Sequence, residues 1–429
     1  MSSRLDVHVG AAMFSKALTV VSWIAPLSLL MWAVRIDVLE GYIYEVPRNF
    51  AGDFTAVSSL QVPEWWDGRG MFYGPIFVLE ARYLVIPHVL SRADFARADF
   101  LLFGLAFVFV WAALIGRRHP RLTLWLLAAW LAHQATVQAF ANTAHLEVLE
   151  LALLGAALLF AVRGQRPHAG GLLGLATATK TLPVLFIPYL AIRREWTMLA
   201  WACLASGSVF LVACWVLAIA PWEGLAGLAY QRGNLTGLEF TSYHYALRSD
   251  FARVLAQGRE TLAPDQVSLA VALHWMVTVA AILFGVWAIA RSRDAQPRYG
   301  LIFGLVLALM LIVAPSVHLS FFIFLLPAWT AVAVELLRRP LSGLTWLLWF
   351  GLVAAYVMTG FDQPFFLLQR VFGFGLVIPQ QWLSWHLPTI GLFFSLLIVS
   401  TCLLTGAEVE SGPRRTSYGA RLSRVLAFD

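Results

Sequence analysis

Two ionisable side chains lie where their chemistry would matter. Asp53 lies within Gly52-Asp53-Phe54, in a long polar segment rich in acids, aromatics and turn residues. A loop carboxylate commonly caps a helix or stays solvated, but it can also take a proton from a hydroxyl group within hydrogen-bond reach. Lys180 lies in the middle of an apolar run, where a charge is costly and usually functional. Its ordinary alternative is an ammonium that extends to the membrane surface.

Further candidates occur in two later segments. His318 ends the short turn 314–318 between two apolar runs, where an imidazole could bind an anion or orient a hydroxyl group. A helix cap or a satisfied interface residue is the simpler interpretation. Arg248 and Arg253 follow Tyr243-His244-Tyr245 and could also bind an anion. The exposed face of an amphipathic helix explains both arginines equally well.

His145 and Glu147 begin another apolar run, after Asn142 and Thr143. The simpler interpretation is a polar helix N-terminus, in which Asn142 or Thr143 is the cap and the helix dipole favours Glu147. In the alternative, the side chains of His145 and Glu147 line a polar wall beside the candidate site.

The composition identifies the class of protein. Of the 429 residues, 60% are hydrophobic and 13% are charged, and the mean hydropathy is +0.75, whereas soluble domains are about 45–50% apolar. This excludes a disordered chain, a nucleic-acid-binding module and a disulfide-stabilised secreted domain. Cys203, Cys214 and Cys402 all lie in apolar runs without Cys-x-x-Cys spacing, so we interpret them as packing residues.

We expect a single all-α polytopic membrane domain over residues 1–429, a bundle of about 10–12 transmembrane helices with long extracytoplasmic loops. Apolar runs that predict these helices occur at 17–34, 99–115, 122–140, 146–162, 170–192, 197–220, 267–290, 299–314, 319–337, 341–359 and 388–406.

The basic residues predict how the chain threads the membrane. We assume a cytoplasmic N-terminus and a segment 170–192 that enters and returns on one side. More than half of the 30 Lys and Arg, but fewer than a third of the 24 acids, then fall on the cytoplasmic side, as the positive-inside rule requires. Segments 36–98, 221–266 and 360–387 lie outside, and 407–429 is a cytoplasmic tail. The stretch 72–90 is apolar but charged in its middle, which predicts an interfacial helix.

Segment 170–192 is predicted to be a re-entrant hairpin, because Lys180, Pro183 and Pro188 interrupt it. Each half has about 11 residues, or ~16 Å, which reaches about midway across a ~30 Å membrane core. Non-helical backbone is tolerated at that depth only against protein or a wet cavity. We therefore expect a cavity near Lys180.

Four short elements in this setting resemble the GT-C glycosyltransferases, and within them glycosyltransferase family 87, the polyprenol-phosphate-mannose-dependent α-mannosyltransferases. The elements are Gly52-Asp53-Phe54, Phe72-Tyr73-Gly74-Pro75, Asn142–Leu153 and Gly174–Pro183. The acidic residue follows the first helix in a long outer loop, and an aromatic-Gly-Pro stretch comes about twenty residues later.

The resemblance implies transfer of a sugar, mannose in this family, from a polyprenyl-phosphate donor to a glycolipid or glycan acceptor. The reaction would invert the anomeric centre at the outer face of a bacterial plasma membrane. Asp53 would be the general base, with His318 as a second catalytic residue. Lys180, Arg248 and Arg253 would meet the phosphate charge. The remaining substrate-binding candidates are Tyr73, Trp65, Trp66, His145, Glu147, Tyr243 and His244.

A transporter or flippase of a lipid-linked sugar is the alternative function. Transporters tend to have paired repeats and binding residues near the membrane midplane, whereas acids and aromatics here collect in unequal outer loops, which favours an enzyme. The sequence lacks strong metal-ligand spacing, a Gly-rich phosphate loop and a Gly-x-Ser-x-Gly element. We expect no cofactor, and a divalent metal is neither required nor excluded. The expected partners are the lipid donor, the acceptor and the bilayer, without nucleic acid.

Overall fold

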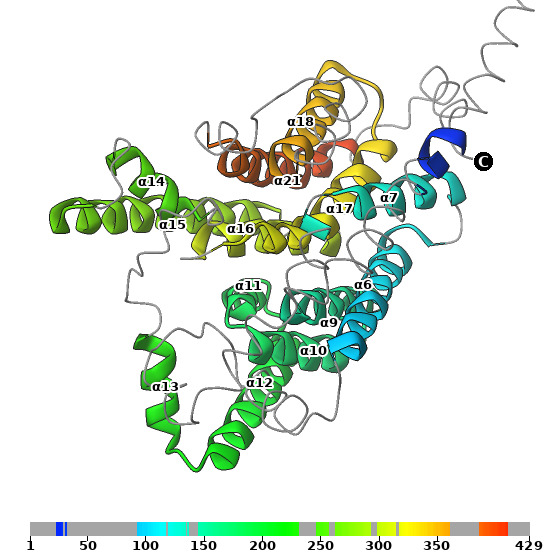
Figure 1. Cartoon of the computed structure of the whole chain (residues 1–429). Coiled ribbons are helices and arrows are strands. Elements are labelled where there is room, and N and C mark those ends of the chain that lie inside the picture. The colour runs from blue at the N-terminus through cyan, green and yellow to red at the C-terminus, as the bar shows by residue number, and fades with distance from the viewer. Residues whose placement is uncertain are drawn as a thin grey trace, which may run out of the picture.

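The computed structural model describes residues 23–28, 31, 92–116, 119–133, 135–136, 145–230, 246–256, 262–292, 298–314, 317–360 and 386–410. Throughout these ranges the regular structure is helical, which confirms the all-α fold class (Figure 1). Six of the described helices are long and apolar enough to cross a membrane. The chain is therefore a multi-pass membrane protein. The expected interfacial helix at 72–90 and the tail beyond residue 410 lie outside the described residues.

Most helices in the first half of the chain coincide with the predicted apolar runs. They are α6 (Arg92–Leu114), α7 (Pro120–Ala132), α9 (His145–Val162), α10 (Arg166–Thr179), the 3-10 helix η4 (Leu182–Leu185), α11 (Phe186–Ile192), α12 (Trp196–Leu217) and α13 (Pro221–Tyr230). The prediction of one helix over 122–140 is wrong, because α7 ends at Ala132. The His133 ring accepts a hydrogen bond from the Ala135 N–H at 3.1 Å, which competes with the helical hydrogen bond.

The second half adds α14 (Leu247–Ala256), α15 (Pro264–Arg291), α16 (Tyr299–Val313), the 3-10 helix η6 (Leu319–Phe324), α17 (Leu325–Arg338), α18 (Gly343–Gly360) and α21 (Leu387–Glu410). The segment 221–266, predicted as an outer loop, thus contains α13 and α14. Helix α21 also extends four residues into the expected tail, which was predicted to start at 407.

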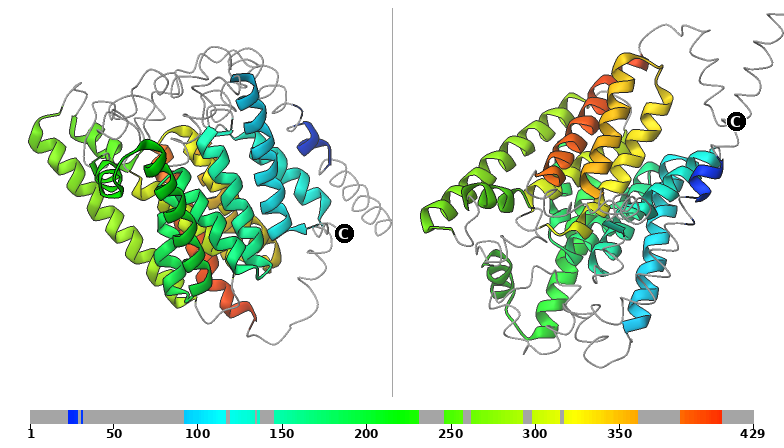
Figure 2. Two further views of the ribbon diagram at one scale, coloured as in Figure 1. Left: turned by 90° about the horizontal axis from the view of Figure 1, so that it is seen from below. Right: turned by 45° about the horizontal axis from the view of Figure 1, so that its top comes forward.

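Helix α16 is the central element of the bundle. Its residues from Gly300 to Ile312 are all buried, as expected of a helix that is apolar on every side. Helices α15, α17 and α21 pack against it, and α9 and η4 contact it from the first half of the chain. In Figure 1 and Figure 2, α6, α9, α10 and α12 lie together, and α15 to α21 form a second group.

The broken segment after α9 turns back on itself, as the hairpin prediction requires. Helices α10 and α12 start at the same end, because the Arg166 Nε lies 2.7 Å from the Glu195 Oε2. They run side by side so closely that a Cβ on Gly170 would lie 2.3 Å from the Met198 carbonyl oxygen. Small residues four apart allow this backbone approach. The chain therefore enters along α10 and returns along α11 to the end where it began, although α10 starts at 166 rather than 170.

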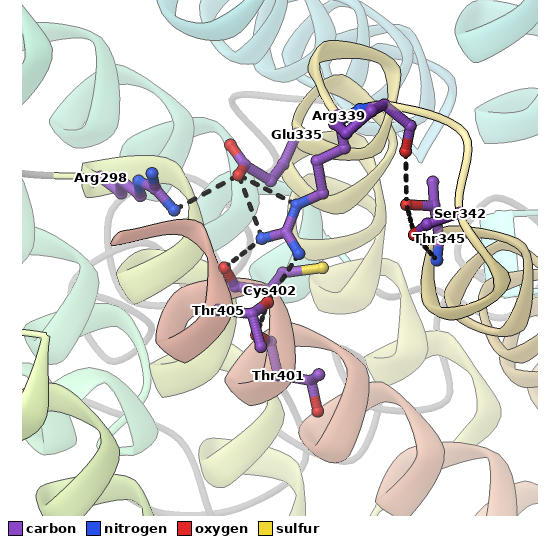
Figure 3. Close-up of polar contacts among 9 residues, drawn as sticks. Arg298, Glu335, Arg339, Ser342, Thr345, Thr401, Cys402 and Thr405 are labelled. Carbon is purple, nitrogen blue, oxygen red and sulfur yellow. Dashed lines mark hydrogen bonds and ion pairs between the residues drawn. The ribbon is translucent and has the colours of Figure 1, made fainter. Parts of the chain in front are cut away.

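A polar cluster closes that same end of the bundle, and we name it the Arg339 cluster (Figure 3). The Glu335 Oε1 lies 3.3 Å from the Arg298 Nη1 and 3.1 Å from the Arg339 Nη2. The Arg339 guanidinium also donates to the Cys402 carbonyl and the Thr405 hydroxyl, both at 2.6 Å. The cluster joins the start of α16 and the ends of α17 and α21. Tyr299, next to Arg298, donates to the Glu195 Oε1 at 3.0 Å, which links the cluster to the start of α12.

The close contact of α10 with α12 predicts a sharp difference between neighbouring glycines. We expect Gly174→Ala to destabilise the protein by about 1–3 kcal/mol through overpacking. A Cβ there would lie 2.4 Å from the Ala202 carbonyl oxygen and 2.8 Å from the Ala205 Cβ. Gly171→Ala on the same helix is the matched control, because its Cβ would have no neighbour within 4 Å. Thermal unfolding of the purified variants in detergent tests this, and equal melting temperatures would contradict it.

Candidate functional site

Lys180 lies at the break between α10 and η4, inside the protein. Its backbone is extended, with φ −147° and ψ 139°, and its side chain forms a buried ion pair with Glu147 of α9. The ammonium nitrogen also lies 3.7 Å from the centre of the Phe321 ring in η6, which is a cation–π contact. Only 4% of Lys180 is exposed. The ammonium therefore stays in the bundle instead of extending to a membrane surface.

A second acid lies next to this pair. Glu150, one turn after Glu147 on α9, is fully buried, and neither of its carboxyl oxygens has a hydrogen-bond partner among the described residues. Burial of such a group is costly, and the positive charge of Lys180 acts favourably on it. Two acids and one ammonium thus share a single interior region, which we name the Lys180 site.

His318 lies beside the same region, and it is exposed. It precedes η6, and the Phe321 N–H donates to its carbonyl oxygen at 3.0 Å. The centres of its ring and the Phe321 ring are 5.7 Å apart in an edge arrangement. The Phe321 ring therefore lies between the two predicted residues. It contacts the Lys180 ammonium, and it lies in an edge arrangement with the His318 ring.

Arg248 and Arg253 belong to a different polar group on α14. The interpretation of Arg248 as an exposed residue is wrong, because only 5% of it is exposed. Its charge acts on His274 of α15, which is also buried. Arg253 forms an ion pair with Asp250, one turn earlier.

The Asp250 carboxylate is the centre of this group, and the sequence analysis missed it. Its Oδ1 also lies 3.0 Å from the His386 Nδ1, and its Oδ2 accepts a hydrogen bond from the Thr389 hydroxyl. His386 and Thr389 lie at the start of α21, more than 130 residues further along the chain. We name this group, with Arg253, the Asp250 site. The three-residue spacing of Asp250 and Arg253 was visible in the sequence, but the contacts with α21 were not.

The Lys180 and Asp250 sites lie toward the end of the bundle that is opposite to the Arg339 cluster. Helix α16 begins in that cluster and ends five residues before His318. Helix α21 begins at the Asp250 site and reaches the cluster at Thr405, about 24 Å further at 1.5 Å per residue. The long segments before α14 and between α18 and α21 join the bundle at the same end as the Asp250 site.

The structure brings together only part of the predicted site. Glu147 and Lys180 are in contact, His318 is next to them through Phe321, and Arg248 and Arg253 share α14. His145 begins α9, but its side chain is outside the described residues. The same holds for the whole of Asp53, Trp65, Trp66, Tyr73, Tyr243 and His244. In the described ranges, no group of three or more His, Cys, Asp or Glu is arranged to hold a metal ion.

These features define a multi-pass helical membrane protein with buried charges at a broken hairpin and a polar group at one end of the bundle. The model of glycosyltransferase family 87 matches residues 72–315, more than half of the 429 residues. The chain therefore belongs to glycosyltransferase family 87 and is a membrane glycosyltransferase. No curated protein and no solved structure gives a significant match to it.

The matched range includes most of the sequence elements on which the resemblance was based. Phe72-Tyr73-Gly74-Pro75, Asn142–Leu153 and Gly174–Pro183 all lie within it, together with Lys180 and Arg248. Gly52-Asp53-Phe54 and His318 lie before and after it.

The buried pair of Glu147 and Lys180 predicts a strong dependence of stability on charge balance. We expect Lys180→Met to destabilise the protein by about 3–5 kcal/mol, because one partner of a buried ion pair is then left uncompensated. The double variant Lys180→Met with Glu147→Leu should recover most of that loss. Thermal unfolding of both variants measures the difference. A double variant that is less stable than Lys180→Met would contradict this account.

Proposed function

We propose that this glycosyltransferase moves a sugar from a polyprenyl-phosphate donor to a glycolipid or glycan acceptor, with inversion at the anomeric carbon. The sugar is mannose, the one that the family resemblance implies. The observation that carries the proposal is the match to family 87 over the helices that hold the buried Lys180 and the basic α14. Family membership also favours an enzyme over the alternative of a lipid-linked sugar transporter.

The proposed reaction divides the work among a base and several cations. The acceptor oxygen attacks the anomeric carbon, Asp53 takes the hydroxyl proton, and the bond from the sugar to the phosphate oxygen breaks. The departing phosphodiester becomes a phosphomonoester with one more negative charge, which positive groups stabilise. Lys180, Arg248 and Arg253 supply positive charge, and His318 binds the phosphate or orients the acceptor. Tyr73, Trp65, Trp66, His145, Glu147, Tyr243 and His244 would contact the sugar and acceptor.

This division needs no metal ion, so we propose that chelation leaves the rate of transfer unchanged.

We further propose that the reaction takes place at the extracytoplasmic face of a bacterial plasma membrane, with both termini in the cytoplasm. The basic Arg166, Arg298 and Arg339 at one end of the bundle support this orientation, because basic residues favour cytoplasmic ends.

The role of Asp53 predicts a large loss of turnover without a loss of folding. Purified protein incubated with polyprenyl-phosphate-mannose and candidate glycolipid acceptors should transfer mannose, and Asp53→Asn should lower the rate by about 10²–10⁴-fold, the usual contribution of a general base. Donor affinity should change little, because only the proton acceptor is lost. Near-normal transfer by Asp53→Ala would remove Asp53 from the mechanism. Absence of transfer by the wild-type protein would contradict the proposed donor.

The proposed orientation predicts which introduced cysteines a membrane-impermeant reagent can label. In a background without Cys203, Cys214 and Cys402, cysteines at Gly164 and Arg193 should react only from the cytoplasmic side, since both ends of the hairpin would lie there. Cysteines at Gly68 and Gly237 should react from outside. Labelling of position 193 from outside would contradict the orientation.

A further inference from the structure

Glu150 is a buried acid that has no role so far in the fold or in the proposed reaction. None of its surface is exposed, and in the described part of the chain its two carboxyl oxygens make no hydrogen bond. Its neighbours on α9, Val148, Leu149 and Leu151, are apolar. A leucine in place of Glu150 would avoid the cost of burying a carboxyl group. The carboxyl group therefore needs an explanation outside the contacts that it makes in this state.

The charges around Glu150 indicate a carboxylic acid rather than a carboxylate. In the described ranges, the Lys180 ammonium acts favourably on its negative charge and the Glu147 carboxylate acts unfavourably. Lys180 forms its ion pair with Glu147, and one ammonium cannot compensate two carboxylates. An uncompensated carboxylate in a protein interior takes up a proton instead of staying charged. Glu150 therefore holds a proton that it can donate in a hydrogen bond.

A phosphate can bind the Lys180 ammonium only by replacing a present contact, because Lys180 is 4% exposed. Among the described contacts, the Phe321 ring is neutral and Glu147 supplies the negative charge. Glu147 is thus the group that a phosphate would displace. Its carboxylate would then stay buried without an opposite charge, which is strongly unfavourable. Phosphate binding at Lys180 therefore requires a second partner for Glu147.

We propose that Glu150 is this second partner, and that it donates a hydrogen bond to the Glu147 carboxylate when a phosphate displaces Glu147 from Lys180. This inference rests on the proposed function, because the phosphate is that of the polyprenyl donor. Side chains three residues apart on a helix are neighbours, so changes of rotamer bring the two groups together without movement of α9.

The exchange of partners balances in protons and in charge. The proton stays between the carboxyl groups of Glu150 and Glu147, in an O–H···O⁻ hydrogen bond of the strong, charged kind. The positive charge of Lys180 then acts on the phosphate. Glu150 is a positioning residue, since it acts on the phosphate only through Glu147 and Lys180.

The first test is the binding of a short-chain polyprenyl monophosphate to purified protein in detergent, with uncharged polyprenol as reference ligand. We expect Glu150→Leu to weaken phosphate binding by about 10- to 150-fold, the range for a charged hydrogen bond, and to leave polyprenol binding unchanged. Glu150→Gln keeps a neutral N–H donor, so its loss should be smaller. Glu223→Gln on α13 is the control, because it removes an exposed acid and should leave the affinity unchanged.

Thermal unfolding separates this role from a structural one. The melting temperature of Glu150→Leu should not fall, because the acid has no hydrogen bond to lose in the state without phosphate. A lower melting temperature with unchanged phosphate affinity would show a purely structural role and overturn the inference.

A double-mutant cycle identifies Glu147 as the partner. In a Glu147→Gln background, no carboxylate at position 147 has to be compensated when the phosphate binds. Adding Glu150→Leu should then cause no further loss of affinity. The monophosphate carries no sugar, so the proposed contact of Glu147 with the sugar does not enter the measurement. An equal loss from Glu150→Leu in both backgrounds would overturn the inference.

Infrared spectroscopy follows the proton itself in variants that preserve the shape of the side chain. Wild-type protein should show the C=O stretching band of a buried carboxylic acid, and this band should shift when the monophosphate binds. Glu150→Gln should lack the band, and Glu223→Gln should retain it. Phosphate binding by the wild type without a shift of the band would contradict the exchange of partners.

The inference and the proposed function can fail separately. If wild-type protein transfers mannose but Glu150→Leu binds the monophosphate as tightly as wild type, the role of Glu150 is wrong and the function stands. If wild-type protein transfers no sugar but the cycle shows the expected coupling of Glu150 and Glu147, the exchange of partners stands and the proposed reaction is wrong.

Discussion

A positive charge inside a membrane bundle has to be compensated at the place where it lies, and the Lys180 ammonium imposes this requirement on the structure. Glu147 supplies the opposite charge and the Phe321 ring supplies a face of negative potential. The pair therefore fixes α9, the break in the hairpin and η6 relative to one another. The position of His318 is fixed as a consequence, because η6 begins directly after it.

Close packing of small residues makes that arrangement possible. The hairpin can approach α12 only because Gly170 and Gly174 have no side chain on the contact face. Gly304 in α16 packs in the same way against Ala328 of α17, where a Cβ would lie 2.9 Å from the Ala328 Cα. Backbone contacts of this kind bring helices together in an apolar solvent, so charged side chains inside the bundle do not have to supply all of the association.

The sequence predicts the features that depend on local patterns. Apolar runs place most of the helices, and Lys180 with its neighbouring prolines marks the hairpin break. Glu147 and Lys180 could each be predicted as candidate site residues. An acid at a helix start and a lysine in an apolar run can both be recognised from a few neighbouring residues. Their mutual contact could not be predicted, since no local pattern relates α9 to the hairpin tip.

Asp250 illustrates the same limit more strongly. Three contacts satisfy its carboxylate, and two of them come from the start of α21, so only the fold reveals them. The sequence also did not predict that α7 ends at Ala132. The acceptor that interrupts the helix is the His133 side chain. The residues around His133 are all apolar or neutral, so no local pattern marks the end of the helix.

The two sites at the proposed active end differ in how their charged groups are paired. At the Lys180 site, one ammonium is already paired with Glu147, and Glu150 lies beside it, so a phosphate could engage Lys180 only in competition with carboxyl groups. At the Asp250 site, the Arg253 guanidinium and the His386 ring both contact the Asp250 carboxylate. In the proposed reaction the phosphate gains a negative charge as the sugar leaves, and positive groups stabilise that charge. Lys180 therefore has two roles in the proposed reaction, to hold the hairpin tip through its ion pair with Glu147 and to stabilise the phosphate in competition with that carboxylate.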